Sequence, residues 1–468
     1  MPLPDIKPAR LPACQYVDNF ADAHPPLTNA QALIEAERCY YCHDAPCVTA
    51  CPTGIDIPSF IRRIGEDNLR GAARAILEAN VFGGMCARVC PTEVLCEQAC
   101  VRNTFEAKPV EIGLLQRHAT DHVFASIGVP LFTRAALTGK RIAVVGAGPA
   151  GLSCAHRAAM LGHDVTVFEA RPKAGGLNEY GLATYKTPDD FAQREIAWLL
   201  SIGGIAIRHG QLLGEQITFA RLAAEYDAVF LGMGLGGVNA LGLADESLGG
   251  VALSGVENAV AFIAGLRQAT DYAAVPVGRR VIVIGGGMTA VDAAVQSKKL
   301  GARQVTIVYR RDQQQMPASK HEQEWAQLNG VTIRTFSVLK SLDHSLGHVQ
   351  GATFSEVHEV PAVGGRLEVT GRQWTAEADT VLKAIGQTLV LADPMLQTLV
   401  LQSGRIKVDA EGRTSLTNVW AGGDCTYGGQ DLTVEAVEHG KIAAQSMDHA
   451  FGIVRGDKPF TRVRKQAA

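Results

Sequence analysis

Eight of the eleven cysteines in this 468-residue chain lie between residues 39 and 100. They form two groups with spacings of two to four residues: Cys39, Cys42, Cys47 and Cys51, then Cys86, Cys90, Cys96 and Cys100. Such spacings let a short stretch of backbone direct several thiolates at one centre, and soft thiolates suit iron–sulfur clusters or zinc. Zinc sites usually use two C-x2-C pairs, whereas Cys51 precedes a proline as in ferredoxin-type loops. The pattern favours iron–sulfur clusters over zinc, and zinc over disulfides.

A complete dinucleotide fingerprint follows the cysteines. A short apolar strand from residue 140 leads into Gly146-x-Gly148-x-x-Gly151, a helix runs to about Leu161, and a second strand ends at Glu169. The glycines permit a tight turn and close approach to a pyrophosphate, and the acid binds ribose hydroxyls. This acidic version suits FAD or NAD. Far downstream, Asp424 stands in a glycine-rich turn before a helix, where it binds ribityl or ribose hydroxyls or simply caps the helix.

A second fingerprint, Gly285-x-Gly287-x-x-Ala290, is followed by a strand that ends in Arg310 and Arg311 instead of an acid. Two cations there suit the 2′-phosphate of NADPH, although a solvated strand end gives the same pattern. A disulfide reductase also pairs FAD and NAD(P) folds, but it needs a redox cysteine pair after the flavin fingerprint. No cysteine lies between Glu169 and Gly285, which excludes that class.

These motifs imply an α/β protein of three parts. Residues 60–80 and 110–128 have helical apolar periodicity, so residues 1–138 are expected to form an α-helical iron–sulfur domain. Alternating strands and helices then predict two doubly wound Rossmann-like domains. The FAD domain comprises residues 139–255 and 389–468, and the NAD(P) domain, residues 256–388, is inserted in it.

Composition narrows the functional classes. The 47% hydrophobic content and 49 glycines fit an α/β protein, and the formal charge of −3 gives no reason to expect nucleic-acid binding. No run reaches 18 apolar residues, and the first residues lack the apolar stretch of a signal peptide. A cytoplasmic protein without a membrane segment is expected.

Along almost its whole length the chain resembles the flavin and iron–sulfur part of dihydropyrimidine dehydrogenase, a separate small subunit in bacteria. Glutamate synthase small subunits share this architecture. Three segments carry the resemblance to the pyrimidine branch: AERCYYCHDAPCVTACPTGIDIPSFI, MCARVCPTEVLCEQAC and VEIGLLQRHAT.

The resemblance implies two [4Fe-4S] clusters with interleaved ligands. One takes Cys39, Cys42, Cys47 and Cys100, and the other takes Cys51, Cys90, Cys96 and Gln116. Spacing alone nominates Cys86 as the eighth ligand, so the two assignments disagree, and we follow the family. The glutamate synthase branch tends to have a glutamate where this chain has Gln116.

The resemblance also implies nucleotide-binding residues. For FAD they are Ala147, Gly148, Pro149, Ala150, Gly151, Glu169, Leu177, Lys186, Gly423, Asp424, Asp431, Leu432 and Thr433. For NAD(P)H they are Gly286, Gly287, Met288, Thr289, Arg310, Arg311, Ala384, Ile385 and Gly386. A further family arginine for the 2′-phosphate falls on or beside Pro317, so the choice between NADH and NADPH stays open.

The implied function is that of an electron-input subunit. NAD(P)H gives hydride to FAD, and the clusters carry single electrons to a partner FMN/iron–sulfur subunit that reduces uracil or thymine. A pyrimidine-reducing (β/α)8 barrel would need about 250 further residues, so the partner is expected to supply it. No acid–base residue is assigned as catalytic. The alternatives are a small subunit of NADPH-dependent glutamate synthase, a related NAD(P)H:ferredoxin-type, transhydrogenase or bifurcating oxidoreductase, and a zinc-stabilised scaffold.

Overall fold

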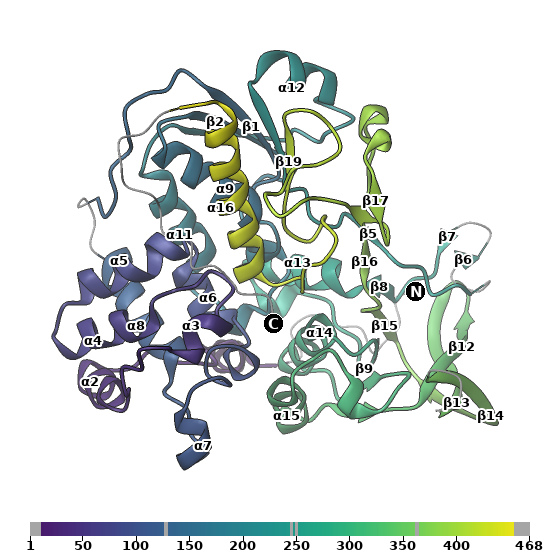
Figure 1. Ribbon diagram of the computed structural model, residues 1–468. Coiled ribbons are helices and arrows are strands. Elements are labelled where there is room, and N and C mark those ends of the chain that lie inside the picture. Colours follow the sequence, from purple (N-terminus) through teal and green to yellow (C-terminus); the bar gives the residue numbers. More distant parts are fainter. Residues whose placement is uncertain (1–10, 126–129, 244–246, 249–250, 361–364, 454–468) are drawn as a thin grey trace. The chain divides into compact units, whose positions relative to one another are not determined.

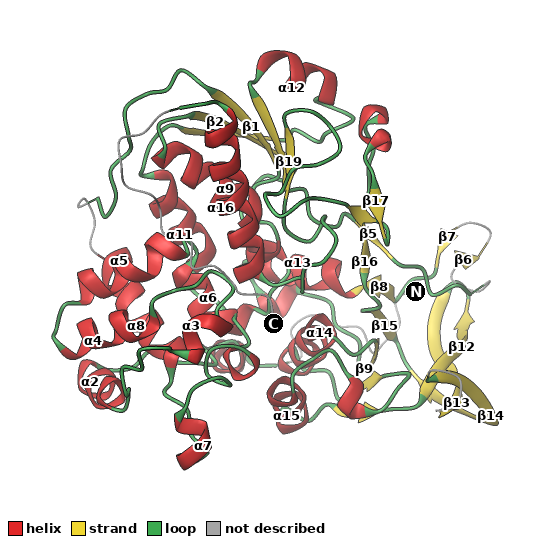
Figure 2. Ribbon diagram, viewed as in Figure 1, coloured by secondary structure: helices red, strands yellow, loops and turns green. Residues whose placement is uncertain are grey.

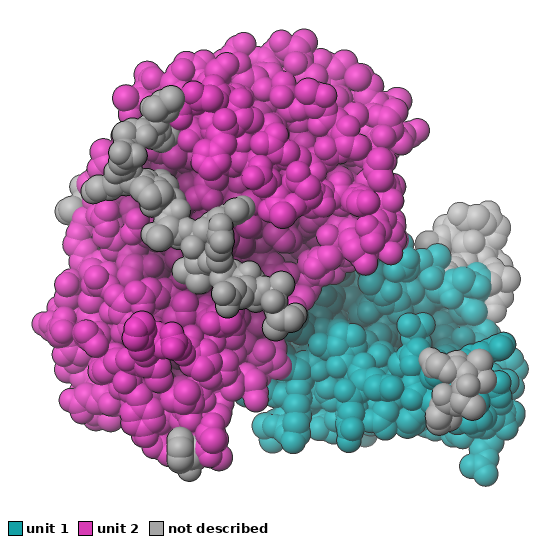
Figure 3. Space-filling view, viewed as in Figure 1, with its two compact units in different colours: residues 1–23, 180–188, 237–387 teal, residues 24–179, 189–236, 388–468 magenta. Residues whose placement is uncertain are grey.

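The chain passes repeatedly between two structural units, so each unit is assembled from segments that lie far apart in sequence. The computed structural model describes residues 11–125, 130–243, 247–248, 251–360 and 365–453. Unit 1 contains Met1–Ala23, Tyr180–Pro188 and Gly237–Gln387, and unit 2 contains His24–Glu179, Asp189–Gly236 and Thr388–Ala468 (Figure 3). Each unit is described by itself.

The cysteine-rich part of unit 2 is helical, and the described residues that precede the first strand form only helices and loops (Figure 2). Local caps explain where several helices begin. Thr28 and Gln31 form a capping box, and the side chains of Asp56 and Asn68 accept hydrogen bonds from N–H groups three residues ahead. The helices are α2 (Asn29–Glu37), α3 (Pro46–Ala50), α4 (Ile57–Gly65), α5 (Leu69–Ala79), α6 (Gly83–Val89), α7 (Arg102–Glu106) and α8 (Ile112–Ala125).

Apolar residues at helical spacing build the core of this part. In α4, the buried residues Ile57, Phe60, Ile61 and Ile64 recur every three or four positions and face one cluster that also contains residues of α5 and α8. The predicted helical segment 60–80 forms parts of two helices, because the chain turns at Asp67 (φ 55°) before the cap of α5. The predicted segment 110–128 contains α8.

A five-stranded parallel sheet in unit 2 carries the first fingerprint. Its strand order is β19-β4-β1-β2-β3, so β1 lies between β4 and β2. Strand β1 is almost wholly buried, as parallel strands covered on both faces usually are. Helices α9 and α16 pack against each other (Figure 1). The elements are β1 (Arg141–Val145), β2 (Asp164–Glu169), β3 (Ile205–His209), β4 (Ala228–Leu231), β19 (Val419–Ala421), α9 (Pro149–Met160), α11 (Phe191–Leu200), α12 (Phe219–Glu225) and α16 (Thr433–Ala450).

Unit 1 has a second five-stranded parallel sheet with the order β11-β10-β9-β15-β8. A three-stranded antiparallel sheet, β12-β13-β14, belongs to the same unit. The elements are β8 (Val256–Asn258), β9 (Arg280–Ile284), β10 (Gln304–Val308), β11 (Thr332–Arg334), β12 (Ser337–Ser345), β13 (His348–Val360), β14 (Arg366–Glu377), β15 (Thr380–Lys383), α1 (Ala13–Asn19), α13 (Ala259–Gln268), α14 (Met288–Lys299) and α15 (Lys320–Leu328).

Short elements connect these layers. They are α10 (Leu177–Tyr180), η1 (Thr92–Val94), η2 (Thr184–Lys186), η4 (Tyr272–Ala274), η5 (Gln313–Gln315), η7 (Pro394–Thr398), β5 (Gly237–Val238), β6 (Ser247–Leu248), β7 (Val251–Ala252), β16 (Gln387–Thr388), β17 (Leu401–Gln402) and β18 (Arg405–Ile406). None of the helices in the described ranges is long and apolar enough to cross a membrane.

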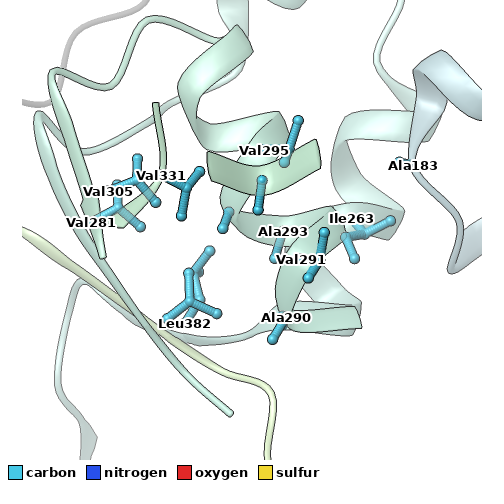
Figure 4. Packing of buried hydrophobic residues seen from close by; sticks show 14 of the residues in the cluster. Ala183, Ile263, Val281, Ala290, Val291, Ala293, Val295, Val305, Val331 and Leu382 are labelled. Carbon is cyan, nitrogen blue, oxygen red and sulfur yellow. The ribbon is translucent and has the colours of Figure 1, made fainter. Parts of the chain in front are cut away.

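The core of unit 1 includes a segment from an unexpected part of the sequence. Ala183 lies in the same buried cluster as Val281 of β9, Val291 of α14 and Leu382 of β15 (Figure 4). Residues 180–188 and 11–23 therefore fold with unit 1, although the predicted boundaries place them in other domains. The boundaries after residues 138, 255 and 388 remain predictions.

The predicted fold class is confirmed. Helices precede two Rossmann-like parallel sheets, and all strands of the second sheet lie between β4 and β19 of the first in sequence. The second nucleotide-binding fold is therefore inserted in the first.

Candidate functional site

Four cysteines from two separate segments line one small pocket in unit 2. Cys39 and Cys42 lie in the loop before α3, Cys47 lies on α3, and Cys100 lies just before α7. Ile57, Ile61, Val110 and Ile112 are among the apolar residues that complete the wall. This is the set that the family resemblance assigns to one cluster.

Burial favours the protonated form of two of these thiols, Cys39 and Cys47. Burial raises the pKa of Cys47 to about 12, and the neighbouring Cys39 and Cys100 add to the effect. The pKa of Cys39 is also raised, mainly by burial and further by Cys42 and Cys100. A cluster that binds four thiolates here would displace their protons, and its positive charge would stabilise the thiolates. The donor set fits a thiolate-ligated iron–sulfur cluster.

Cys39, Cys42, Cys47 and Cys100 are called the first cysteine group, and Cys51, Cys86, Cys90 and Cys96 form the second. The pKa of Cys90 is raised well above its ordinary value by a hydrogen bond with Cys86, by burial and by nearby Cys96 and Cys51. The pKa of Cys96 is raised mainly by burial, with contributions from Glu97, Cys51 and Cys47. Cys96 is thus close enough to interact electrostatically with Cys47 of the first group and with Cys51 of its own group. The two groups are therefore neighbours. Within the described ranges, no three or more His, Cys, Asp or Glu side chains are close enough to hold a single metal ion.

Gln116 and Cys86 are the two candidates for the eighth cluster ligand. Cys86 lies on α6, and Gln116 contacts the first residue of that helix. The Gln116 side chain on α8 is buried, and its Nε2 donates to the carbonyl oxygen of Gly83 at 2.6 Å. That hydrogen bond uses the amide nitrogen of Gln116. The side-chain oxygen is therefore the atom that could bind iron. Cys86 lies on α6 and is buried beside Cys90. The assignment to Gln116 stays a prediction.

Helix α16 packs against the cysteine-rich core. Val434, in its first turn, belongs to the buried cluster that contains Cys51, and Leu432 packs against the same cluster. Further along α16, Lys441 Nζ donates to the carbonyl oxygens of Thr53 at 3.2 Å and Ala79 at 2.9 Å. Lys441 therefore ties α16 to the backbone two residues after Cys51.

The first fingerprint adopts the geometry that a dinucleotide needs. Gly146 has a φ of +94°, and a Cβ there would lie 2.5 Å from the carbonyl oxygen of Gly232. A Cβ on Gly151 would lie 1.9 Å from the carbonyl oxygen of Gly146. Helix α9 begins at Pro149 with Gly148 as its N-cap and no side-chain cap, so its first N–H groups remain available to a phosphate. The loop fits a pyrophosphate.

Glu169 ends β2, as predicted from the strand pattern, and its carboxylate braces the fingerprint loop. Oε2 accepts a hydrogen bond from the N–H of Ala147 at 2.7 Å, and Oε1 accepts one from the N–H of Arg171 at 2.8 Å. The acid therefore lies beside the phosphate-binding turn, where a ribose diol would reach it. Leu177 begins α10, just after the Gly175-Gly176 turn.

The distant flavin-binding segment meets the same loop. A Cβ on Gly423 would lie 3.0 Å from Cβ of Ala150, so the segment after β19 closely approaches α9. The pKa of Asp424 is raised to about 6, mainly by burial and also by nearby Asp431, whereas Arg405 opposes the shift. Asp431 pairs with Arg405 (Nη2 to Oδ2, 2.7 Å), and Thr433 Oγ1 donates to Asn178 Oδ1 at 2.8 Å. These residues suit the ribityl chain and phosphates of FAD.

The second fingerprint has similar constraints in unit 1. A Cβ on Gly285 would lie 2.1 Å from the carbonyl oxygen of Ala384, and a Cβ on Gly286 would lie 2.5 Å from the ring of Tyr309. Gly287 is the N-cap of α14 without a side-chain cap, and Met288 and Thr289 open the helix. Ala384, Ile385 and Gly386 follow β15, the strand next to β9. The loop and these residues fit a nicotinamide dinucleotide.

Lys186, predicted to neighbour the flavin, lies in unit 1. Its Nζ pairs with Asp292 Oδ1 of α14 at 2.8 Å and Glu322 Oε1 of α15 at 2.6 Å. Burial lowers the pKa of Lys186, but the two carboxylates outweigh burial and raise it overall. The ammonium thus anchors η2 in the core of unit 1, a role that the sequence pattern gave no sign of. Its proposed position beside the flavin remains a prediction.

Comparison with known proteins decides the family. Residues 16–127 match the family described as dihydropyrimidine dehydrogenase domain II, 4Fe-4S cluster, and residues 140–440 match pyridine nucleotide-disulphide oxidoreductases. The NAD-dependent dihydropyrimidine dehydrogenase subunit PreT of Salmonella typhimurium is 34% identical over 94% of this chain and 98% of its own length. The chain belongs to this family.

The chain is also similar to the glutamate synthase [NADPH] small chain of Escherichia coli strain K12, with 31% identity over 94% of this chain and 96% of that protein's length. Among solved structures, FprA of Mycobacterium tuberculosis in complex with NADPH has a TM-score of 0.56 and 18% identity, over 67% of this chain and 85% of that chain. That likeness shows the shared fold of the two nucleotide-binding parts.

Membership in the dihydropyrimidine dehydrogenase small-subunit family makes the protein an NAD(P)H-dependent flavin and iron–sulfur oxidoreductase. The predicted family and enzyme class are confirmed. The sequence had no signal for Lys441, Glu195 or Glu359, three residues whose contacts with the predicted sites appear only in the fold.

Proposed function

We propose that the chain is the electron-input subunit of a dihydropyrimidine dehydrogenase. It takes electrons from NAD(P)H and passes them through two [4Fe-4S] clusters to a partner FMN/iron–sulfur subunit, which reduces uracil or thymine to the 5,6-dihydropyrimidine. The observation that carries the proposal is the placement of two cysteine groups and a dinucleotide fingerprint within one unit. A bound flavin supplies the conversion between a hydride donor and one-electron acceptors.

The packing of α16 supports an order for the relay. Lys441 of α16 donates to the carbonyl oxygen of Thr53, two residues beyond Cys51 of the second cysteine group. Val434, in the first turn of α16, belongs to the buried cluster against which cysteines of both groups pack. The first group lines a pocket that also includes Tyr40, a residue that is 53% exposed. We infer that electrons leave the flavin-binding segment through the second group and exit through the first.

Part of the proposed electron-transfer path is buried within the protein. Cys51 and Gln116, two of the proposed ligands, are buried, and Cys51 belongs to a cluster with apolar side chains of α4, α5 and α8. Burial of the ligands lowers solvent access and helps set the potential of a bound cluster. In this proposal no side chain acts as an acid or base.

Pyrimidine reduction is assigned to the partner, because the described residues form a helical layer, two Rossmann-like sheets and a small antiparallel sheet, but no (β/α)8 barrel. The relative from Salmonella typhimurium is itself named a subunit. The purified chain is expected to oxidise NAD(P)H with an artificial dye and to leave uracil untouched. Uracil turnover by the isolated chain would overturn this division of labour.

A glutamate synthase small subunit is the second candidate, favoured by the 31% identity to the Escherichia coli small chain. Gln116 counts against it, since that branch tends to have a glutamate at this position. The two candidates are separated by adding either partner to the reduced chain. Glutamate formation with the large amidotransferase subunit, and no dihydrouracil with the FMN subunit, would select glutamate synthase.

A further inference from the structure

The two arginines after β10 differ in their surroundings. Arg310 is exposed, whereas Arg311 Nη1 contacts Glu359 Oε1 at 2.6 Å and the carbonyl oxygen of Gly365 at 3.3 Å. In Rossmann-like folds the residues after this strand face the adenosine ribose and distinguish a 2′-phosphate from a 2′-hydroxyl. Glu359 therefore brings a carboxylate to the position that decides between NADPH and NADH.

Hydrogen bonds to both carboxylate oxygens fix the side chain of Glu359 in place. It lies on β13, and its second oxygen, Oε2, accepts a hydrogen bond from Gln315 Nε2 at 3.2 Å. Gln315 is fixed in turn by a capping box with Asp312 and by the hydroxyl of Tyr309, which donates to its carbonyl oxygen at 2.9 Å. Residues 309–315 are thus organised around this carboxylate.

The local charges oppose a 2′-phosphate. Arg310 and Arg311 are matched by Asp312 and Glu359, so the loop presents no net positive charge. A phosphate with a charge near −2 would have to displace Glu359 from Arg311 and tolerate the carboxylate beside it. A ribose diol carries no charge and can donate hydrogen bonds to a carboxylate.

We propose that Glu359 is a specificity-determining residue that makes this chain prefer NADH over NADPH despite its arginine pair. This inference rests on the proposed function, because it concerns the reductant of that same relay. It assigns the role to one carboxylate on the antiparallel sheet, outside both fingerprints. Arg311 then serves mainly to hold Glu359 in place.

The test uses the full-length holoprotein and two ligands that differ only in the 2′-phosphate, AMP and 2′,5′-ADP. Their affinities are measured by calorimetry for the wild type, Glu359→Gln and the matched control Glu356→Gln. Glu356 lies on the same strand and pairs with Arg334 at 3.8 Å. The kcat/KM ratio for NADH against NADPH with a dye gives an independent comparison.

We expect the wild type to bind 2′,5′-ADP no better than AMP and to prefer NADH. Glu359→Gln should strengthen 2′,5′-ADP binding by about tenfold, the scale of one lost charge repulsion, and leave AMP binding unchanged. Glu356→Gln should change neither ligand. Adding Arg311→Met to Glu359→Gln should remove the gain, because the released guanidinium is what would bind the phosphate.

A wild type that prefers NADPH, or a Glu359→Gln variant whose ratio of affinities stays within about twofold of the wild type, would overturn the assignment. If the proposed function is wrong, the outcome is distinguishable from this one. A chain that does not use a nicotinamide nucleotide would bind neither AMP nor 2′,5′-ADP and would not reduce the dye. Retained FAD absorbance in each variant shows that the protein has folded.

Discussion

Glu195 of α11 holds Met85 at the start of the cysteine-bearing helix α6. Its Oε1 accepts hydrogen bonds from the N–H of Met85 at 3.0 Å and of Gly84 at 2.8 Å, and the side chain is fully buried. A helix N-terminus favours a hydrogen-bond acceptor at this place. Because Cys86 lies on α6 and Cys90 directly follows it, this contact positions the second cysteine group.

Removing the Glu195 carboxyl should therefore loosen α6. Glu195→Ala leaves two buried N–H groups without an acceptor and should destabilise the protein by about 1–3 kcal/mol. Glu195→Gln keeps the oxygen acceptor and should cost less. The measurement is the apparent Tm of anaerobic holoprotein together with its iron content. Equal Tm and iron content in Glu195→Ala and the wild type would show that α6 does not depend on this contact.

The same residue predicts a pH dependence. Burial raises the pKa of Glu195 to about 8 from its ordinary value of 4.5, although Met85, Arg88 and Gly84 oppose the shift and Asp121 adds to it. Between those values the folded protein binds more protons than the unfolded chain, so this group's contribution to stability is lost as pH rises.

The apparent Tm of wild type and Glu195→Gln should therefore diverge with pH. Relative to the variant, which has no proton to lose, the wild type should become progressively less stable from pH 5 to pH 8. Both proteins are scanned at one rate in matched buffers, because unfolding of a cofactor-containing protein need not be reversible. A constant difference across this range would contradict a raised pKa at Glu195.

Iron analysis separates Gln116 from Cys86 as candidates for the eighth ligand of the two proposed clusters. If Gln116 is the eighth ligand, Cys86→Ser should retain about eight iron atoms per chain, whereas Cys90→Ser should lose about half. Cys154→Ser, at a buried position on α9, is the matched control for changing a cysteine. Loss of half the iron in Cys86→Ser, with normal iron in Gln116→Leu, would instead assign the ligand that spacing alone nominated.

Local patterns predicted much of the fold. The two glycine fingerprints, their strands and Glu169 could be found from the sequence because each depends on neighbours within about 30 residues. The turn at Asp67, which separates α4 from α5, was not predicted, since helical periodicity continues through it.

Long-range polar contacts could not be predicted. Glu359 contacts Arg311 across 48 residues, and Lys441 contacts Thr53 across 388. No periodicity or motif links such pairs, because tertiary packing alone brings them together. Lys186 likewise gave no sign that its segment would fold into unit 1.

The central claim is that electrons from NADH reach the pyrimidine only through the cysteine groups of this chain. The direct measurement mixes the chain anaerobically with the FMN/iron–sulfur partner, NADH and uracil, and quantifies dihydrouracil by mass spectrometry. Wild type should form one dihydrouracil per NADH, and a Cys51→Ser/Cys90→Ser variant that keeps FAD and dye reduction should form none. Dihydrouracil formation by that variant at the wild-type rate would contradict the account.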